Sequence, residues 1–357
     1  MKTKLGFLFF FFLLLTGTTC TAFGQETHQA AEAKGHGADT EFDASTFIME
    51  HIADSHEWHL WAVKGADGHE KSIAIPLPVI LYSKKNGLDI FMSGKLAHGT
   101  SYKGYKIEEG VIVHESEEGS SAGKTIPLDF SMTKSVVGLL FSCIIGVILF
   151  LSLSRSYKKT GISHPKGLQS FLEPIILFVR DDIAIANIGK HKYEKFMPYL
   201  LTVFFFILIN NLMGLIPFPP PFGANVTGNI AVTFVLAFFT FIITQFSGNK
   251  NYWKHIFATP GVPFWLLPVM VPVELIGIIS KPFALMIRLF ANITAGHIIV
   301  LSLICLIFIF KSVAVAPVSI LFVIFMDCLE LLVAFLQAYV FTLLSALFIS
   351  LAVQEHH

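Results

Sequence analysis

Two pairs of polar residues stand out in the apolar C-terminal part of this chain: Arg288 with Gln337, and His297 with Glu330. An arginine keeps its positive charge in proteins, and placing it at bilayer depth costs about 2.5 to 3.5 kcal/mol on insertion scales. An imidazole exchanges protons near neutral pH, and a neighbouring carboxylate tunes that exchange. These residue types predict a proton relay, His297 with Glu330, near a permanent positive charge inside a membrane.

The pairing follows from two long apolar segments, at about 263–310 and 313–353. A helix needs about 20 residues to cross a bilayer core, so segments of roughly 40 residues imply strong tilt, or kinks at Pro268, Pro272 and Pro282. If the two helices run antiparallel from a short connection, residues equally far from that connection lie at the same depth. The two pairs then form two layers, with the His–Glu layer roughly 10 to 13 Å closer to the outside.

The first of these segments carries further polar residues on the arginine's side. At about 100° per residue, Glu274, Lys281 and Arg288 recur every seven positions, and Asn292 follows one turn later. They therefore share one stripe of the helix, and Glu274 falls on the cytoplasmic side of Arg288.

Several of the intramembrane residues have a second interpretation. His297 and Glu330 could form a static ion pair that only joins two helices. Asp327, near the outer end, is either a channel mouth or an end residue that reaches the lipid headgroups. Asn210 and Asn211 are interpreted first as residues that hydrogen-bond between helices, with a channel-lining role as the alternative.

Composition sets the class of protein that must position these residues. The chain has 357 residues, 54% hydrophobic and 14% charged, with zero formal net charge. That profile is typical of a multi-span membrane protein with one modest soluble region, and it excludes a nucleic-acid binder, which would have a basic imbalance. The cysteines lie in a leader or in apolar segments, so neither a disulfide framework nor a Cys-based metal site is expected: Cys20, Cys143, Cys305 and Cys328.

Three further apolar runs complete the membrane part. Residues 135–153 can cross a bilayer and end at a cluster of Arg and Lys that the positive-inside rule places in the cytoplasm. Residues 199–218 and 230–246 form a hairpin that crosses outward and back, whereas the mixed stretch 167–195 reads as a helix lying in the inner interface. The fold class predicted is an all-α multi-pass membrane protein with five membrane segments, including the two long tilted C-terminal helices.

The chain divides into three parts. Residues 1–24 have the charged start, short apolar core and small residues of a cleaved signal peptide. Residues 25–130 form a His-rich, partly β extracytoplasmic domain, and 131–357 form the membrane domain. The mature N-terminus is therefore expected outside and the C-terminus in the cytoplasm.

Within the exported part, 73–83 and 88–93 read as the strands of a hairpin joined by a turn at Asn86-Gly87, and 105–114 reads as one further strand. His51, His56 and His59 could ligate zinc. The favoured interpretation is a polar helix face in water, so no metal site is predicted.

The segments SKPFALMIRLFANITAGHIIV and ELLVAFLQAYVFTLLSALFISLA, which carry the two pairs, resemble subunit a of the F-type ATP synthase. That subunit is the stator channel beside the rotating ring of c subunits. The stretch NNLMGLIPFPPP in the earlier hairpin also fits, so the resemblance covers 131–357. The sequence around Arg288, with asparagine four and Ala-Gly seven and eight positions later, is the most specific part.

The resemblance implies a role for each residue of the two pairs. Arg288 matches the family's essential arginine, and Gln337 matches the glutamine that faces it. His297 and Glu330 match a pair in the outer half-channel, in the arrangement with histidine on the first helix. Some bacterial members place the two the other way round.

Three more positions are assigned by resemblance. Glu274 matches a glutamate associated with proton passage, and Asn292 matches a family asparagine. Gly214 stands where some members have an aspartate, which leaves that position's part in the channel open.

The resemblance also implies partners and a location. The expected partners are the c-subunit ring, the b-subunit peripheral stalk, the rest of the ATP synthase and the lipid bilayer, in a bacterial inner membrane. No cofactor and no catalytic site of the chain's own are expected. The main alternative is a stand-alone secondary transporter that binds an anionic substrate at Arg288. A structural scaffold would leave that arginine unexplained, and proton versus sodium coupling stays open.

Overall fold

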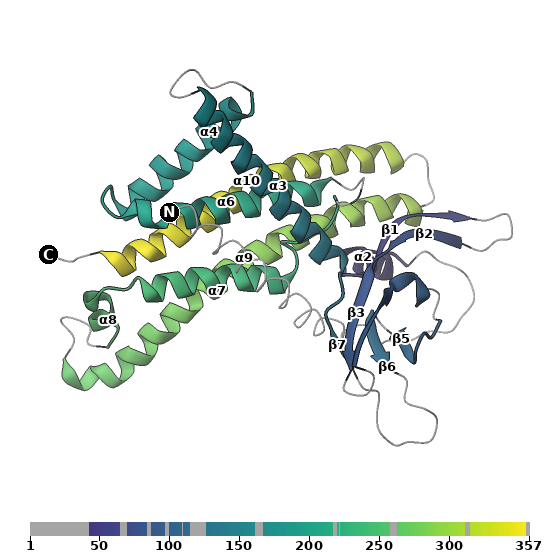
Figure 1. Cartoon of the computed structure of the whole chain (residues 1–357), viewed down its shortest axis with the longest axis horizontal. Helices are drawn as coiled ribbons and strands as arrows, with labels where there is room; N and C mark the ends of the chain where they lie inside the picture. The colour runs from purple at the N-terminus through teal and green to yellow at the C-terminus, as the bar shows by residue number, and fades with distance from the viewer. Residues whose placement is uncertain are drawn as a thin grey trace.

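A computed structural model of the chain gives its architecture (Figure 1). The predicted signal peptide and the His-rich stretch that follows it lie outside the described residues. The described residues are 43–64, 70–83, 87–96, 100–108, 110–114, 126–160, 167–216, 220, 222–257, 263–310 and 315–354.

The membrane part is helical. Four of its described helices are long and apolar enough to cross a bilayer, and a fifth span is possible where α7 bends by 102° into the short α8. These elements confirm the predicted all-α membrane fold with five segments: α3 (Lys134–Thr160), α6 (Tyr193–Leu215), α7 (Ile230–Phe246) with α8 (Lys250–Phe257), α9 (Leu267–Phe310) and α10 (Val315–Val353).

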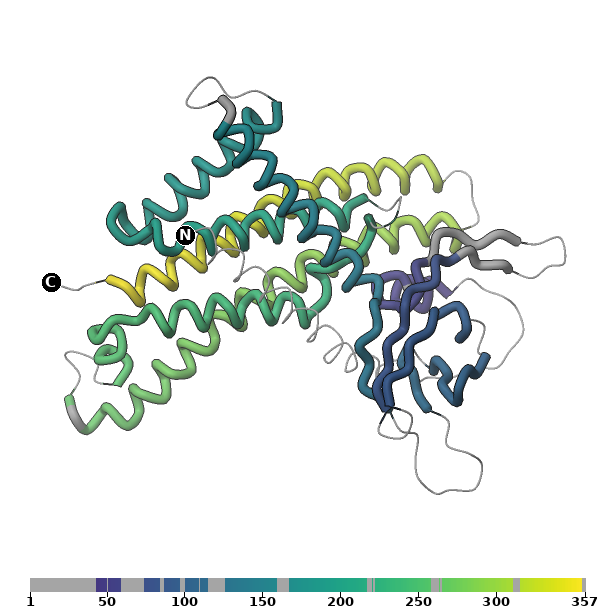
Figure 2. Tube along the Cα trace, in the orientation of Figure 1, coloured from purple at the N-terminus to yellow at the C-terminus, as the bar shows by residue number. Residues whose placement is uncertain are grey.

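The two C-terminal helices have the predicted lengths. Helix α9 has 44 residues and α10 has 39, and they pack against each other. Helix α9 continues through Pro272 and Pro282, because each proline removes only one backbone donor and the rest of the ladder persists. Helix α6 packs on α10 and α7 packs on α9, so the hairpin supports both long helices, as the tube in Figure 2 shows.

The stretch predicted as an interfacial helix is a run of three helical pieces. These are α4 (Leu168–Phe178), the π-helix η3 (Val179–Ile185) and α5 (Ala186–Ile188). With 11 residues, α4 is too short to cross a bilayer core. The exposed Arg180 and Asp181 on η3 bind each other in bidentate fashion at 2.8 and 2.9 Å.

The N-terminal part, residues 43–130, is called the exported part after the sequence-based expectation of export. Its described residues contain a short helix, α2 (Ala44–Ile52), and seven strands. They form three small antiparallel sheets in the orders β1-β2, β4-β3-β7 and β5-β6. The strands are β1 (Glu57–Lys64), β2 (Glu70–Pro76), β3 (Pro78–Ser83), β4 (Gly87–Met92), β5 (Tyr105–Glu108), β6 (Val111–His114) and β7 (Leu128–Asp129).

The predicted hairpin at 78–92 is confirmed, since β3 pairs with β4 from Pro78 opposite Met92 to Ser83 opposite Gly87. Two strand predictions are wrong. Residues 73–83 are not one strand, because Pro76 and Pro78 flank Leu77, whose N–H donates to the Ser93 hydroxyl instead of a ladder.

Residues 105–114 are likewise not one strand but the β5–β6 hairpin. Gly110 has a φ of 81°, a left-handed conformation that suits glycine and reverses the chain. The reversal lets Tyr105 pair with His114 across the hairpin. Tyr105 and Ile112 of these strands lie in the exported core with Val79, Leu81, Phe91 and Leu96.

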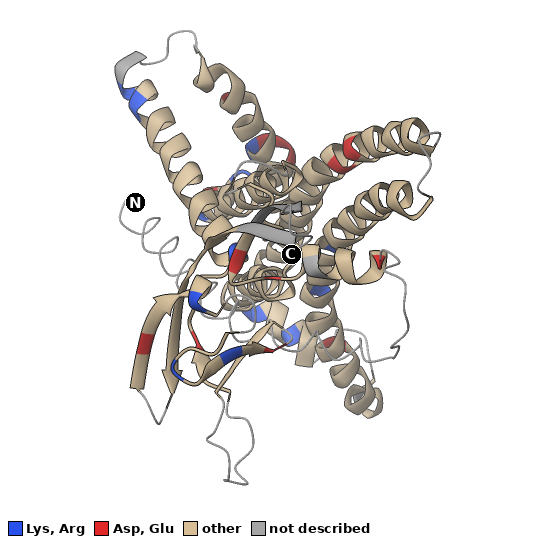
Figure 3. Cartoon of the chain, turned by 90° about the vertical axis from the view of Figure 1, so that its right-hand side faces the viewer, with Lys and Arg blue, Asp and Glu red and all other residues tan. Residues whose placement is uncertain are grey.

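The exported part is joined to the membrane part at the first turn of α3. The Asp54 carboxylate accepts hydrogen bonds from the Thr133 hydroxyl at 2.8 Å and from the Ser135 N–H at 3.0 Å. The first N–H groups of a helix lack intrahelical partners, so Asp54 acts as a cap supplied from a distant segment. Few charges interrupt the membrane helices themselves (Figure 3).

We predict that Asp54→Ala loosens this junction. Losing a cap of this kind costs about 0.5 to 2 kcal/mol, so protease should release the exported part faster from the purified chain. The matched control is Asp43→Ala, because Asp43 caps only α2, by accepting from the N–H groups of Ser45 and Thr46. Equal cleavage rates for the two variants would contradict the junction role.

The predicted zinc candidates have other partners. His56 Nε2 lies 2.9 Å from Asp129 Oδ2, and the His51 ring lies 5.1 Å from the ring of Phe47. The side chain of His59 lies outside the described part. Burial alone would raise the pKa of Asp129, but hydrogen bonds from His56 and Ser131 outweigh burial and hold that pKa below its usual range.

This depressed pKa predicts a pH-dependent contribution to stability. The contribution of Asp129 is present above the carboxyl's unfolded pKa and is lost as the pH falls through its lower folded value. Asp129→Asn should therefore lower the melting temperature of the chain at pH 7, and the difference from wild type should shrink below about pH 4. A difference that is constant across this range would contradict the prediction.

Candidate functional site

The first predicted pair meets between α9 and α10. The Gln337 side chain is 5% exposed, and its Nε2 donates to the Arg288 carbonyl oxygen at 3.4 Å. This contact uses the main chain of Arg288 and not its side chain. The guanidinium lies on an exposed face of α9, where another molecule can contact it. Among the described residues, no carboxylate forms an ion pair with it.

The second pair lies nine residues further along α9. His297 Nδ1 is 3.9 Å from Glu330 Oε2, and their side chains are only 20% and 13% exposed. Both predicted juxtapositions are therefore present. The remaining carboxylate oxygen, Glu330 Oε1, is buried without a hydrogen-bond partner among the described residues, so the carboxylate keeps a free site for a water or a proton.

A cavity of about 270 Å³ opens on this pair. Asp327, one turn from Glu330 on α10, lines the cavity. The lining also comes from the α6–α7 connection, the start of α3 and the exported part. Its other lining residues are His51, Ile52, Trp58, Lys134, Gly214, Leu215, Gly223, Asn225, Val300, Leu301, Ile304 and Val323.

A second, small cavity of about 10 Å³ lies beyond the pair. His297 and Glu330 line this cavity too, together with Asn211, Ile293 and Ala334. Ile293 and Ala334 lie one turn further from the α9–α10 connection than the pair does. The His–Glu pair therefore stands between a wide outer space and a narrow inner one.

The face of α9 and α10 around Arg288 is apolar and uncovered. Phe283 and Ile287 on α9 are 60% and 38% exposed, and Leu332 and Leu336 on α10 are 57% and 44% exposed. An apolar surface of this kind is stable only against lipid or a protein partner. Arg288 therefore lies on an exposed apolar surface that lipid or a protein partner must cover.

The sequence was compared with known families. The ATP synthase A chain family matches residues 137–350, which is more than half of the chain. The chain belongs to the ATP synthase A chain family. A second match, at residues 47–130, is to a domain of unknown function, DUF8433.

Individual relatives agree with that membership. "ATP synthase subunit a" of Chloroherpeton thalassium is 49% identical over 236 residues, which are 64% of this chain and 69% of the relative. "ATP synthase subunit a 2" of Chlorobaculum tepidum is 54% identical over 231 residues, 63% of this chain and 64% of the relative. "ATP synthase subunit a" of Myxococcus xanthus is 48% identical over 239 residues, which are 64% of this chain and 76% of the relative.

Within this ATP synthase A chain member, two glycines shape the surroundings of the pair. A Cβ on Gly296 would lie 2.4 Å from Glu330 Oε1, so only glycine lets the carboxylate approach so closely. A Cβ on Gly214 would lie at an ordinary 3.7 Å from His297 Nε2. Gly214 thus borders the imidazole at the position where the resemblance places an aspartate in some members.

We predict that Gly296→Ala displaces the Glu330 carboxylate from His297. The side chain of Glu330 is flexible, so the helices should still pack and the chain should assemble. Proton conduction by membrane vesicles should fall several-fold at an unchanged amount of chain. The control is Gly277→Ala on the same helix, where an added Cβ meets nothing within 4 Å. Equal conduction by the two variants would show that the position of Glu330 is unimportant.

The two asparagines of α6 differ. Asn211 lies between helices, because its Nδ2 donates to the Ala334 carbonyl at 3.2 Å and its Oδ1 accepts from the Thr227 hydroxyl at 2.6 Å. It also lines the small cavity. Asn210 instead donates to Phe206 of its own helix at 2.8 Å. The interpretation of Asn210 as a helix–helix bond is therefore wrong, and Asn210 is not among the residues that line either cavity.

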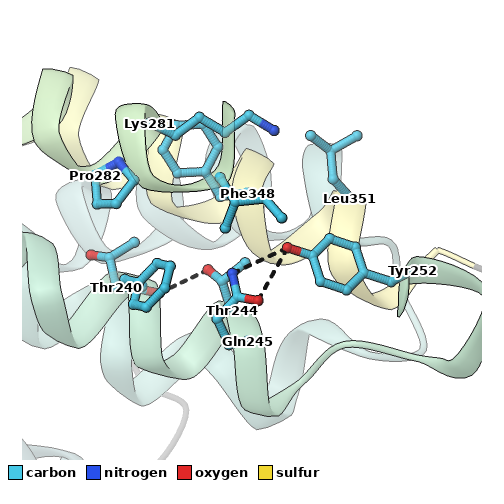
Figure 4. A pocket seen from close by; sticks show the side chains of 10 residues that line it. Thr240, Thr244, Gln245, Tyr252, Lys281, Pro282, Phe348 and Leu351 are labelled. Carbon is cyan, nitrogen blue, oxygen red and sulfur yellow. Dashed lines mark hydrogen bonds between the residues drawn. The ribbon is translucent and has the colours of Figure 1, made fainter. Parts of the chain in front are cut away.

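At the other end of the long helices, away from the α9–α10 connection, a pocket of about 20 Å³ lies where α7, α8, α9 and α10 meet (Figure 4). Lys281 lines it, with its Nζ 5.9 Å from the centre of the Phe348 ring. Gln245 and Tyr252 hydrogen-bond across the pocket at 3.1 Å. Glu274 is half-buried on the preceding turns of α9, whereas Asn292 is exposed one turn beyond Arg288.

Sequence reasoning missed part of this site. It gave no role to Gly296, whose missing side chain admits Glu330, or to Lys134, which lines the outer cavity. Lys134 could have been noticed in the sequence, because it stands at the expected outer end of the apolar run 135–153, where the positive-inside rule disfavours lysine. No local signal marked His51, Ile52 or Trp58 as neighbours of α9 and α10.

Proposed function

We propose that the chain is the proton-channel subunit of an F-type ATP synthase and that it conducts protons through two half-channels that do not meet. The observation that carries the proposal is the His297–Glu330 pair. It borders a wide outer cavity and a narrow inner one, on the same two helices that hold Arg288 and Gln337. The family membership supports it.

In the outer half-channel, a proton enters the cavity, passes His297 and Glu330, and neutralises a carboxylate on the ring. The buried and unpartnered Glu330 Oε1 supports this step, because it offers a site where a proton can bind. Asp327 adds a carboxylate at the mouth, and Asn211 follows on the inner side of the pair. Each proton contributes about 2.3 kcal/mol per 100 mV of membrane potential.

Arg288 acts as the divider between the two half-channels. Its permanent charge favours the ionised ring carboxylate as that group passes, and it repels protons that would cross directly. Gln337 holds the main chain of Arg288 in place at 3.4 Å. Asn292, exposed one turn away on α9, provides a neutral polar neighbour.

In the inner half-channel, the ring turns and the proton leaves past Glu274 into the cytoplasm. The half-buried position of Glu274 on the cytoplasmic part of α9 supports this path. The c ring covers the exposed apolar face around Arg288, and the b-subunit stalk holds the chain still. The membrane is the bacterial inner membrane, with the mature N-terminus outside and the C-terminus in the cytoplasm.

Copurification tests the proposal against the stand-alone transporter. A tagged chain should come out of mild detergent together with a ring and an ATPase head, because ring contact covers its apolar face. A chain that comes out alone, and that transports an anionic solute in vesicles, would overturn the proposal. Sodium dependence of ATP hydrolysis by the purified complex then distinguishes proton from sodium coupling.

A further inference from the structure

One wall of the outer cavity belongs to the exported part of the chain. His51 and Ile52, in the last turn of α2, and Trp58, at the start of β1, line the same space as His297 and Glu330. These residues lie within the match to a domain of unknown function. The space that leads to the pair is therefore enclosed from outside by a segment that the channel family match does not cover.

This wall is built into the membrane part. Helix α2 packs on α9, Asp54 caps α3 through Ser135, and the Lys134 N–H donates to the Ser55 carbonyl at 2.9 Å. Trp58 is 5% exposed and belongs to the membrane core rather than to the exported core. Contacts on both sides of residues 51–58 fix their position against the channel helices.

The chemistry of the cavity suits proton delivery. The His51 imidazole from α2 and the Lys134 ammonium from α3 line the cavity, together with the Asp327 and Glu330 carboxylates from α10. An imidazole can receive and release protons near neutral pH. The two carboxylates attract protons toward the pair, and a cavity of about 270 Å³ has room for the hydrogen-bonded water along which protons move.

We propose that protons reach His297 and Glu330 through a vestibule between the exported part and helices α9 and α10, and that α2 is a working wall of this vestibule. The vestibule is defined by His51, Ile52, Trp58, Lys134 and Asp327. The proposal rests on the proposed proton-channel function and adds a route of access to it. It also gives the exported part a role in conduction.

The test places one thiol on the wall. In a complex whose Cys20, Cys143, Cys305 and Cys328 are replaced by alanine, Ile52→Cys is labelled from outside with a charged, membrane-impermeant methanethiosulfonate. Labelling should slow proton flux several-fold, and a cationic label should slow it more than an anionic label of similar size. The matched control is Met49→Cys on the same helix, which is 54% exposed and does not line the cavity.

Three results would overturn the vestibule: complete labelling of Ile52→Cys with unchanged flux, no labelling from outside, or equal slowing at Met49→Cys. If Ile52→Cys fails to assemble, His51→Cys on the same wall gives the same test. Arg288→Ala in the same background separates the two proposals. ATP-driven proton pumping that persists in Arg288→Ala contradicts the channel assignment. Pumping that is lost in Arg288→Ala but is unchanged by the label contradicts only the vestibule.

Discussion

Arg288→Ala should abolish ATP-driven proton pumping by inverted membrane vesicles while the complex still assembles. The guanidinium lies on an exposed face of α9, with no carboxylate partner among the described residues, so its removal breaks no ion pair there. On the proposed function, what is lost is the fixed charge that stabilises the ionised ring carboxylate and separates the half-channels. ATP hydrolysis by the head should become uncoupled, and a passive proton leak is expected.

The measurement is quenching of a pH-sensitive dye in vesicles, with ATP hydrolysis recorded in parallel. Ile287→Ala is the matched control, because Ile287 is the neighbouring residue, is 38% exposed and carries no charge. Its pumping should stay near wild type. Normal coupled pumping by Arg288→Ala would contradict the proposal that Arg288 separates the two half-channels. Arg288→Lys adds a graded test, since lysine keeps the charge but not the planar fork.

The second large effect concerns the His–Glu pair. Proton transfer through a positioned side chain is typically worth 10²- to 10⁴-fold in rate, and water in the adjacent cavity can replace part of it. Glu330→Gln and His297→Ala should therefore slow proton flux roughly tenfold to a hundredfold. Glu330→Gln keeps the shape of the side chain, so assembly and the amount of complex should not change.

The static-pair interpretation makes the opposite prediction for these variants. If His297 and Glu330 only join two helices, flux should remain at wild-type level and the melting temperature of the complex should fall. The control is Thr294→Ala, one turn from His297 on α9 and half-buried. A loss of flux in Glu330→Gln that matches the loss in Thr294→Ala would point to a general packing effect.

The two-layer arrangement could be predicted because few variables determine it. A helix rises by a constant amount per residue, bilayer-spanning backbone must be helical, and the connection at 311–314 is short. These constraints fixed which residue of α10 meets Arg288 and which meets His297. They did not fix the identity of the contacting atoms, so the bond from Gln337 to the Arg288 carbonyl was beyond prediction.

The exported part was predicted less well for physical reasons. The Pro76-Leu77-Pro78 sequence looks like part of one apolar run, yet the two prolines divide it between two sheets. The docking of α2 on α9 depends on contacts between segments about 240 residues apart. Hydrophobic periodicity carries no information about such partners, so the outer cavity could not be predicted in advance.

The uncovered face that carries Arg288 also bears on how the complex is made. On the proposed function, that guanidinium meets lipid until the ring binds, at a cost of about 2.5 to 3.5 kcal/mol on insertion scales. A copy of the chain with this face uncovered is therefore less stable than a copy whose face is covered. Insertion of this chain beside a completed ring should be favoured over its insertion alone.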